Sequence, residues 1–491
     1  MDFKAKLDKL LKLSIPNLPG ASVLEASYEN NGSFSPSEEI VIEGLPPFYR
    51  VFIEIKSESG ISHTELWLPE SWNNIFVGTG NGGMAGKVSY WSLPGYLKNG
   101  YAAANTDMGT CRGRSSGVGN PDVWKDFGWR ATHQMTECSK FIIKEHYGIS
   151  PEYSYFIGGS TGGQQGLSEA QRFPLDYDGI VAGVPANNRT MLHTYFLWNH
   201  VHLRTPEGRK LFTDEETVII TDCATEFFRK SNGGLPHDNF ISFPQSSPAL
   251  TDAFLKDLQH RHPGFTSEQL AALRAVYSGP VNPRTGERIY NGMPIGSEIY
   301  GCGIKDCQQS ESPHYYPFIW TFGENYSPYS FDFDKDTETL NNTLSADLNA
   351  NSPDISGFKN HGGKLLIYSG SADPCVPFSD AMRYYERVAE RFGGYEGISD
   401  FCRYFLIPGR DHGSGGRGAN AFYSSNGGGE LEIIRRWREQ NTPPDSLKAV
   451  RYRNTANHSE GVELERFIYP YLSERFPACT HPPVCCDTYL R

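Results

Sequence analysis

One short run of the chain combines a β-prone stretch, a Gly-x-Ser-x-Gly pentapeptide and a helical pattern. Tyr155-Phe156-Ile157 precedes Gly158-Gly159-Ser160-Thr161-Gly162, and the helical pattern extends from Gln164 to Arg172. A chain with 51 glycines contains such a pentapeptide by chance, so the flanking strand and helix carry most of the signal. A sharp strand-to-helix turn holds its serine in a strained conformation and needs glycines where the two elements approach closely. The run therefore predicts a nucleophile elbow with Ser160 as nucleophile.

Short apolar strands alternate with helical patterns on both sides of this turn. The alternation covers 75–77, 101–106, 129–147 and 179–183, and it returns at 364–368, 379–392, 401–407 and 430–440. Strands that alternate with helices are typical of a mostly parallel sheet. An apolar–polar alternation over residues 37–69 predicts antiparallel strands before it. Together with the elbow, these patterns predict the α/β class and an α/β-hydrolase core.

The sequence pattern changes between the two regions in which strands and helices alternate. Helical stretches there mix with loops rich in proline and glycine, and we interpret residues 187–351 as a lid domain. The core would then consist of residues 1–186 and 352–491. The lid contains an aromatic run over 314–331, which we interpret mainly as packing. Rings that face a pocket would instead suit an aromatic group of a substrate.

A serine nucleophile needs a histidine base and an acid that orients this base. In α/β-hydrolases they follow the serine in the order acid, then histidine, each on a loop after a strand. Asp373 follows the strand 364–368, and His412 follows the strand 401–407. The sequence therefore predicts Asp373 as the acid and His412 as the base. Asp411 competes for the role of acid, but its position next to His412 would direct it away from the imidazole.

The tetrahedral intermediate of such a reaction needs preorganised N–H donors. Thr161, directly after the nucleophile, supplies one, and a glycine-rich loop after an earlier strand fits the second through Gly82 and Gly83. The same loop matches Gly-x-Gly-x-x-Gly at 78–83, so dinucleotide binding is an alternative. Residues 84–91 are a poor start for the helix that a pyrophosphate site requires, which disfavours that alternative.

Composition limits the partners and the compartment. With a formal net charge of −12 and a pI of about 5.7, the chain lacks the basic balance of a nucleic-acid or anionic-membrane partner. Neither a secretory signal nor a membrane span is visible, so we expect a cytoplasmic protein. Free thiols are then the default for its ten cysteines. The exceptions to watch are Cys302 with Cys307 and the group at 479, 485 and 486.

Several ordered segments resemble the tannase and feruloyl esterase family of serine esterases. They are Leu68-Pro69-x-x-Trp72-Asn73, 80–86, 104–107, Asp126-Phe127-Gly128-Trp129-Arg130, 159–165, Glu169-Ala170-Gln171-Arg172-Phe173-Pro174, 178–186, 358–373 and Pro408-Gly409-Arg410-Asp411-His412. The resemblance implies the same roles for Ser160, Asp373 and His412, and an α/β-hydrolase core with a lid inserted between the elbow strand and the acid strand.

The chain also departs from the family pattern. The family has cysteines just before the nucleophile and just after the histidine, joined in a disulfide, whereas this chain has Gly159 and Gly413. The family lid carries an Asp-rich calcium loop after a cysteine, but Cys223 is followed by 224–230 without paired acidic ligands. We therefore expect no metal and no cofactor. His260-Arg261-His262 is interpreted as a polar helix end.

We expect hydrolysis of a small-molecule carboxylic ester, of an aromatic or phenolic compound, through an acyl-enzyme on Ser160. An alternative is acyl transfer, cyclisation or another tailoring step in secondary metabolism with the same residues, because an intracellular place is unusual for enzymes that digest plant polyphenols. A third hypothesis, a binding protein on an inactive scaffold, is disfavoured because serine, acid and histidine are all present.

Overall fold

The computed structural model describes residues 3–229, 235, 237–244, 247–309, 315–423, 429–455, 457–471 and 486–487. The chain divides into two compact units. The first consists of Met1–Gly183, Phe318–Asn325 and Leu344–Leu365, and the second of Val184–Pro317, Tyr326–Thr343 and Leu366–Arg491. The boundaries 187 and 351 of the expected lid stay a prediction.

The first unit is built on a sheet with the strand order β1-β4-β5-β7-β6-β8-β9. Pairs from β1 to β7 are antiparallel, and β6 pairs in parallel with β7 and β8, as β8 does with β9. This confirms the predicted change from antiparallel to parallel strands. Its strands are β1 (Ala21–Glu29), β4 (Phe48–Lys56), β5 (Ile61–Pro69), β6 (Ile75–Thr79), β7 (Ala102–Thr106), β8 (Tyr153–Gly159) and β9 (Gly179–Gly183), with a separate hairpin of β2 (Ser33–Ser37) and β3 (Ile40–Glu43).

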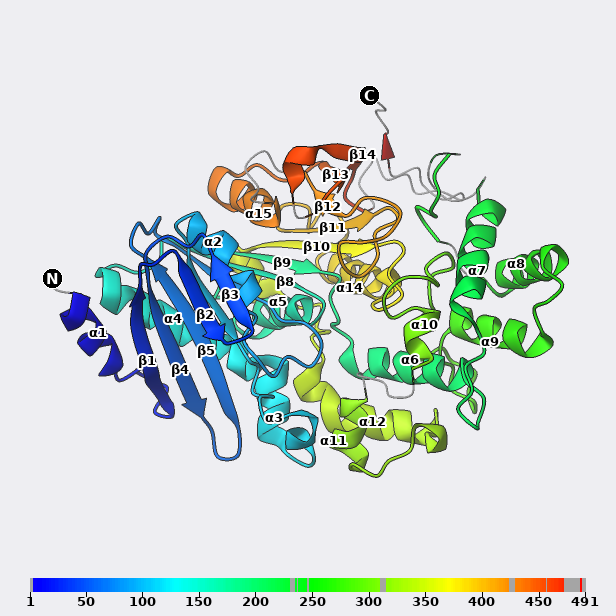
Figure 1. The fold of residues 1–491 in the computed structure, drawn as a ribbon, viewed down its shortest axis with the longest axis horizontal. Helices are drawn as coiled ribbons and strands as arrows, with labels where there is room; N and C mark the ends of the chain where they lie inside the picture. The colour runs from blue at the N-terminus through cyan, green and yellow to red at the C-terminus, as the bar shows by residue number, and fades with distance from the viewer. Residues whose placement is uncertain are drawn as a thin grey trace. The chain divides into compact units, whose positions relative to one another are not determined.

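Burial differs between the two halves of this sheet. Along β4, side by side with β1 and β5 in Figure 1, buried and half-buried residues alternate, which indicates one covered face. Every residue of β6, β7 and β9 is buried, as expected for parallel strands with helices on both faces. The helices of this unit are α1 (Phe3–Leu11), α2 (Pro94–Lys98), α3 (Pro121–Lys125), α4 (Ala131–Tyr147), α5 (Thr161–Arg172) and α13 (Ser356–Asn360).

Two of these helices depart slightly from the sequence pattern. Helix α4 was expected from residue 129, but a π-helical turn, Asp126–Arg130, precedes it. It ends at Gly148, which adopts the left-handed conformation (φ 84°) that stops a helix without a Cβ penalty. Helix α5 begins at Thr161, directly after the serine, so the expected helix after the elbow is confirmed.

The second unit contains most of the helices that follow the elbow. Helices α7 and α9 both begin with a capping box, Thr213 with Glu216 and Thr266 with Gln269, which satisfies their first N–H groups. Apolar faces of α6 to α9, green in Figure 1, bury a common cluster that includes Phe254. The helices of the second unit are α6 (Arg189–His202), α7 (Asp214–Phe227), α8 (Pro248–Arg261), α9 (Ser267–Ser278), α10 (Ile304–Cys307), α14 (Phe378–Arg391) and α15 (Gly429–Gln440). Helices α11 (Tyr316–Phe322) and α12 (Lys335–Leu348) cross a unit boundary.

Strand β10 (Lys364–Gly370), which begins two residues before the second unit, and β11 (Cys402–Ile407) are neighbours, and both were expected from the sequence. An antiparallel sheet follows, with the order β12-β13-β14-β15, which the sequence patterns did not predict. Its strands are β12 (Ala421–Phe422), β13 (Leu447–Tyr452), β14 (Val462–Ile468) and β15 (Cys486–Asp487). In the described part of the chain, no helix is long and apolar enough to cross a membrane.

Candidate active site

Ser160 occupies the turn between β8 and α5 in the first unit. Its backbone angles are φ 60° and ψ −118°, a region that side-chain-bearing residues rarely adopt. Such a conformation costs about 1–3 kcal/mol and persists only where the surrounding structure enforces it. The N–H of Ser160 donates to the carbonyl of Gly183 over 2.9 Å, which fastens the strained residue to the end of β9. The turn has the geometry of a nucleophile elbow.

Close contacts between glycines enforce this turn. A Cβ added at Gly158 would lie 2.5 Å from the carbonyl oxygen of Gly162. A Cβ added at Gly80 would lie 2.4 Å from the Cα of Gly162. Both distances are too short for any side chain, because neither neighbour is a flexible group. The end of β8 and the start of α5 therefore approach each other through bare backbone, as the pentapeptide predicted, and Gly80 after β6 joins this contact.

Hydrogen bonds fix the glycine-rich loop after β6 to the elbow helix. Gly162 N–H donates to the carbonyl of Asn81 over 2.8 Å, and the Thr161 hydroxyl donates to the carbonyl of Gly83 over 2.7 Å. In the described part of the chain, the N–H groups of Gly82 and Gly83 donate no hydrogen bond. The bond between Thr161 and Gly83 holds the loop against the elbow helix, and the role of Thr161, Gly82 and Gly83 as oxyanion donors stays a prediction.

The same loop does not have the form of a dinucleotide site. Such a site directs the first N–H groups of a helix at the pyrophosphate. The first helical segment after the loop is the single 3₁₀ turn Tyr90–Ser92. The dinucleotide alternative therefore lacks its main structural element.

Asp373 and His412 meet in the second unit. Asp373, fully buried on the loop after β10, accepts from Nδ1 of His412 with an Oδ2···Nδ1 distance of 2.9 Å. Its other oxygen, Oδ1, accepts the N–H groups of Cys375 (2.8 Å) and Val376 (2.9 Å). Three donors thus hold the carboxylate, and the bond to Nδ1 leaves Nε2 of His412 as the nitrogen that can act on a substrate.

The two loops that carry this pair are tied to each other. Ala372 N–H donates to the carbonyl of Arg410 over 3.0 Å, and Gly409 N–H donates to the hydroxyl of Ser371 over 2.8 Å. A Cβ at Gly370 would lie 2.3 Å from the carbonyl oxygen of Arg410, so the loops approach without room for a side chain. The loop positions predicted for the acid and the base are confirmed.

Electrostatics favours the charged form of the histidine. Burial acts against a charged imidazole, but the charge and hydrogen bond of Asp373 outweigh it, so the pKa of His412 is raised above 6.5. The charge of Asp411 also raises this pKa, but less than Asp373 does, and the printed hydrogen bond of the ring goes to Asp373. Oδ1 of Asp411 accepts the N–H groups of Gly413 and Gly415 over 2.9 and 3.0 Å, so Asp411 closes its own turn.

The predicted site residues therefore form two groups. Ser160, Thr161, Gly82 and Gly83 belong to the first unit, and Asp373 and His412 belong to the second. Each group has the internal geometry that a serine hydrolase requires. The assembly of all three catalytic residues into one triad is a proposal, taken up below.

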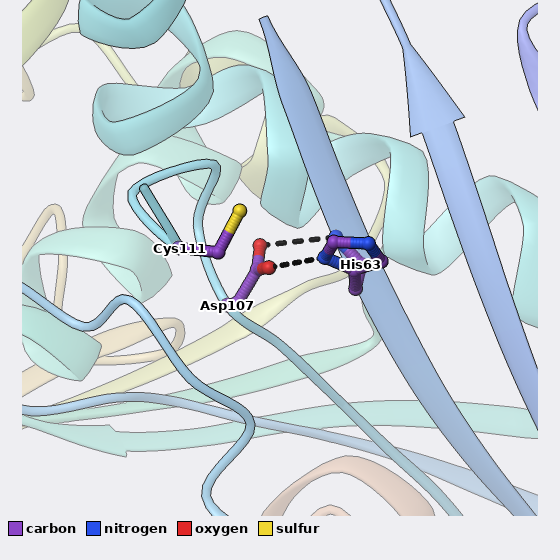
Figure 2. Close-up of side chains that lie close together, drawn as sticks. All are labelled: His63, Asp107 and Cys111. Atoms are coloured by element: carbon purple, nitrogen blue, oxygen red, sulfur yellow. Dashed lines mark hydrogen bonds and ion pairs between the residues drawn. The ribbon is translucent and has the colours of Figure 1, made fainter. Parts of the chain in front are cut away.

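A second histidine–carboxylate group lies in the first unit (Figure 2). The ligand atoms of His63, Asp107 and Cys111 lie within 4.8 Å of one another, a spacing at which they could hold a metal ion. Oδ2 of Asp107 lies 2.6 Å from Nδ1 of His63, and its Oδ1 accepts the N–H of His63. Hydrogen bonds to Asp107 and Cys111 raise the pKa of His63 to about 10. The raised pKa favours the charged imidazole, and the two bonds to Asp107 join β5 to the loop after β7.

Another such group, also within 4.8 Å, consists of His133, Glu169 and Asp176. Nδ1 of His133 lies 2.6 Å from Oδ2 of Asp176, and the ring stacks on Phe173. Burial and the charge of Asp176 raise the pKa of Glu169 well above its usual range, which favours the neutral form of this carboxyl. The expectation of no metal stays a prediction.

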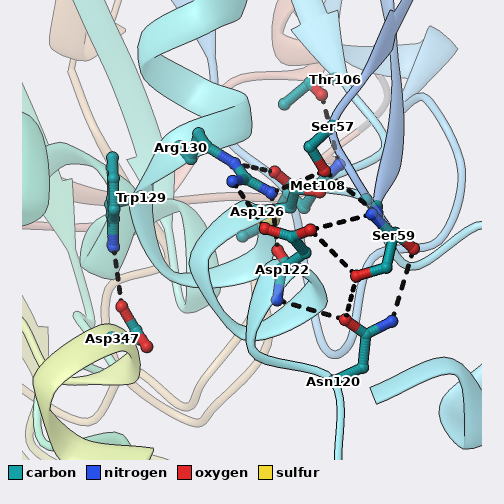
Figure 3. A network of polar contacts seen from close by, with 12 residues as sticks. Ser57, Ser59, Thr106, Met108, Asn120, Asp122, Asp126, Trp129, Arg130 and Asp347 are labelled. Atoms are coloured by element: carbon teal, nitrogen blue, oxygen red, sulfur yellow. Dashed lines mark hydrogen bonds and ion pairs between the residues drawn. The ribbon is translucent and has the colours of Figure 1, made fainter.

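The segment Asp126–Arg130 is the centre of a polar network (Figure 3). The guanidinium of Arg130 reaches both Asp122 (2.9 Å) and Asp126 (2.5 Å), and Trp129 donates to Asp347 over 3.2 Å. Ser59 donates from its backbone to the same Asp122. The network joins α3, the π-helical turn and the β4–β5 turn, which gives this part of the family resemblance a structural role.

The structure also describes three other features of the predicted lid, residues 187–351. Asp222 and Glu226, near the absent calcium loop, form ion pairs with Arg417 (2.7 Å) and Arg229 (2.6 Å). Helix α8 ends at Arg261, so the interpretation of 260–262 as a helix end is confirmed. In the aromatic run, residue 314 lies outside the described residues, whereas Tyr316, Phe318 and Trp320 are almost fully buried, which confirms packing for these three rings.

The seven cysteines whose side chains are described, at 111, 138, 223, 302, 307, 375 and 402, are free thiols, as expected by default. Cys307 donates to the backbone carbonyl of Cys302 over 3.2 Å, whereas the sulfur of Cys302 faces Cys375, 2.8 Å away. Cys479 and Cys485 lie outside the described residues, and of Cys486 only the backbone, in β15, is described.

A family model named tannase and feruloyl esterase matches residues 54–312 and 320–476. The chain belongs to this family. Membership covers most of the sequence and confirms the resemblance that the motifs indicated.

Relatives and a solved structure within the family agree with this assignment. An uncharacterized esterase of Xanthomonas campestris is 29% identical, covering 94% of this chain and 87% of the relative. A probable feruloyl esterase B-2 of Aspergillus oryzae is 28% identical, covering 94% and 90%. The crystal structure of feruloyl esterase B from Aspergillus oryzae, 23% identical, has a TM-score of 0.81 and covers 99% of this chain and all of that one. The fold is that of these α/β-hydrolases, and this family member is a carboxylic ester hydrolase.

Proposed function

We propose that this enzyme hydrolyses esters of aromatic or phenolic compounds through an acyl-enzyme on Ser160, with His412 as base and Asp373 as the acid that orients it. The names of the family relatives, feruloyl esterases among them, support the substrate class. The observation that carries the mechanism is the backbone of Ser160, held at φ 60° and ψ −118° between a strand and a helix. Strain of this kind concentrates at functional sites, where it exposes a reacting group.

In the first step Nε2 of His412 accepts the hydroxyl proton of Ser160 while Oγ attacks the ester carbonyl. The negative charge that develops on the carbonyl oxygen is met by N–H groups of Thr161 and of Gly82 or Gly83. The loop that carries these glycines is bonded to the elbow helix, so the donors are in place before the substrate binds. Collapse of the intermediate releases the alcohol, which takes its proton from His412.

The acyl-enzyme is then cleaved by the reverse sequence. His412 takes a proton from water, the hydroxide attacks the acyl carbonyl, and Ser160 leaves with the proton. Asp373 stabilises the imidazolium through its bond to Nδ1. The N–H groups of Cys375 and Val376 keep this carboxylate in position.

A Ser160→Ala variant tests the nucleophile. We expect loss of hydrolysis of methyl ferulate and loss of covalent labelling by a fluorophosphonate, because the labelled oxygen is gone. Ser37→Ala, on the exposed end of β2, is the matched control and should keep both. Turnover or labelling that persists in Ser160→Ala would disprove the mechanism.

Product analysis tests the reaction type. With methyl ferulate and a competing alcohol, hydrolysis yields ferulic acid as the main product, whereas acyl transfer yields a new ester. The named esterases among the relatives favour hydrolysis. A new ester as the main product would replace hydrolysis by acyl transfer and leave the role of Ser160 intact.

A further inference from the structure

Three cysteines of the second unit converge beside the proposed catalytic acid. Cys375 lies two residues after Asp373 and donates its N–H to the carboxylate, and the sulfur of Cys302 lies 2.8 Å from that of Cys375. Cys307 completes the group through its contact with the backbone of Cys302. Cys302 and Cys375 are 73 residues apart in the chain, so only the fold brings them together.

Both sulfurs are attached to well-fixed backbone. The N–H of Cys302, a residue with φ 67°, donates to Asp306 over 2.8 Å, and Gly303 N–H donates to the carbonyl of Tyr300. On the other side, the hydroxyl of Tyr195 donates to the carbonyl of Pro374 over 2.7 Å. Cys375 is only 5% exposed and belongs to the apolar cluster against which Cys302 packs. The approach of the two sulfurs is thus imposed by the surrounding structure.

The distance between the sulfurs has a chemical meaning. Carbon atoms in contact lie about 3.5–4.0 Å apart, and sulfur is larger, so two thiols at 2.8 Å are pressed together. A disulfide of about 2.05 Å needs a further approach of less than ~1 Å. We propose that Cys302 and Cys375 are a disulfide-forming pair that reacts with a small disulfide such as oxidised glutathione.

The exchange is balanced in two steps. The thiolate of half-buried Cys302 attacks one sulfur of oxidised glutathione, which forms a mixed disulfide and releases one glutathione thiolate. The thiolate of Cys375 then attacks the Cys302 sulfur and releases the second. The two cysteine thiols lose two electrons and two protons, and the two glutathione molecules gain them. Cys302 reacts first because Cys375 is buried and its pKa is raised by the contact with Cys302 and by burial.

The bond would affect the acid of the active site. It would restrain the residue whose N–H holds Oδ1 of Asp373, and thereby the carboxylate that orients His412. This consequence, unlike the bond itself, rests on the proposed roles of Asp373 and His412. The oxidised enzyme should therefore resist thermal inactivation better than the reduced enzyme.

Peptide mapping tests the bond directly. The intact protein is equilibrated with oxidised glutathione, its remaining thiols are alkylated, and the digest is analysed by mass spectrometry without reductant. We expect a disulfide-linked peptide pair that contains Cys302 and Cys375 and disappears after dithiothreitol. Unlinked thiols at both positions, or a bond between Cys302 and Cys307, would overturn the proposal.

Variants connect the bond to stability. Oxidation should raise the thermal midpoint by on the order of 5 °C, because the bond closes a long loop of the unfolded chain. Cys302→Ser and Cys375→Ser should each abolish the difference between oxidised and reduced protein, whereas Cys111→Ser, an exposed cysteine of the first unit, should keep it. A difference that persists in both pair variants would contradict the assignment. The cross-link is read without a substrate, so its failure and that of the ester-hydrolysis mechanism are distinguishable.

Discussion

Gln165, in the elbow helix, and Asn81, in the loop after β6, form two hydrogen bonds with each other. The N–H of Asn81 donates to Oε1 of Gln165 over 2.9 Å, and Nε2 of Gln165 donates to Oδ1 of Asn81 over 3.3 Å. Both side chains are buried. Gln165 thereby fixes the loop of Gly82 and Gly83 to the helix that begins beside Ser160.

This relationship makes Gln165 a positioning residue for the oxyanion donors. Gln165→Ala should lower kcat about 10- to 100-fold with little change in KM, because a misplaced donor weakens binding of the transition state alone. Gln171→Ala on the same helix, which loses a bond to Ala350, is the control and should keep kcat. Steady-state kinetics on methyl ferulate, which gives kcat and KM of both variants, tests this prediction. An equal loss of kcat in both variants would indicate a general effect on the helix.

Two neighbouring aspartates provide a test of the acid. Asp373→Asn should lower kcat about 10³- to 10⁴-fold, because an amide no longer selects the correct tautomer of His412. Asp411→Asn should stay within a few fold of the unchanged enzyme, since an amide oxygen still accepts the N–H groups of Gly413 and Gly415. If Asp411→Asn were the more damaging change, the assignment of the acid would be wrong.

The raised pKa of His412 sets the acid limit of activity. The imidazole must be neutral to accept a proton, so kcat/KM is fully present above its pKa and falls as the pH drops through it. Because the pKa is raised, this loss should begin above pH 6.5. In Asp373→Asn, burial is left to lower the pKa, and the acid limb of the residual activity should move to lower pH. A limb that did not move would show that another group titrates.

The contact between glycines predicts sensitivity at the elbow. Gly80→Ala should prevent folding or strongly destabilise the protein, since its Cβ would lie 2.4 Å from the Cα of Gly162. Gly95→Ala in α2, where nothing lies within 4 Å of the added carbon, should be tolerated. Thermal unfolding of the two purified variants gives the comparison. Equal stability would mean that the backbone can separate at this point.

A buried ion pair in the second unit should contribute strongly to stability. Arg466 of β14 and Asp238 are bonded through two pairs of atoms, and their side chains are 1% and 2% exposed. Asp238→Ala should lower the unfolding free energy by about 3–5 kcal/mol, because a buried guanidinium loses its partner. Asp222→Ala breaks a more exposed pair with Arg417 and should cost at most about 1 kcal/mol. Similar thermal midpoints would argue that water reaches Arg466.

The sequence identified the parts of the site that are encoded locally. Ser160 stands in a pentapeptide between a strand and a helix, and Asp373 and His412 each follow an apolar strand, so short patterns were sufficient to place them. The π-helical turn at Asp126–Arg130 was not predicted, because its residues are compatible with the ordinary helix that follows. The strands β13 and β14 were likewise missed, since their mixed burial gives a weak pattern.

Contacts between distant residues were beyond local patterns. Asn81 and Gln165 are 84 residues apart, and nothing in either neighbourhood indicates the other. The same holds for Cys302, which the sequence singled out only together with the nearby Cys307, whereas its sulfur faces Cys375. These contacts depend on packing of the whole unit, which a single sequence does not reveal.

The first unit is assembled from segments that are translated far apart in time. The side chain of Gln164, in the elbow helix, donates to the carbonyl of Leu348, which lies 184 residues later in the chain. At about 5–20 residues per second, the ribosome delivers this acceptor roughly 10–40 s after the helix itself. A nascent chain that stops before residue 344 lacks the last segment of the first unit, Leu344–Leu365. The helix that follows Ser160 therefore gains its bond to Leu348 only late in synthesis, long after the turn itself has been made.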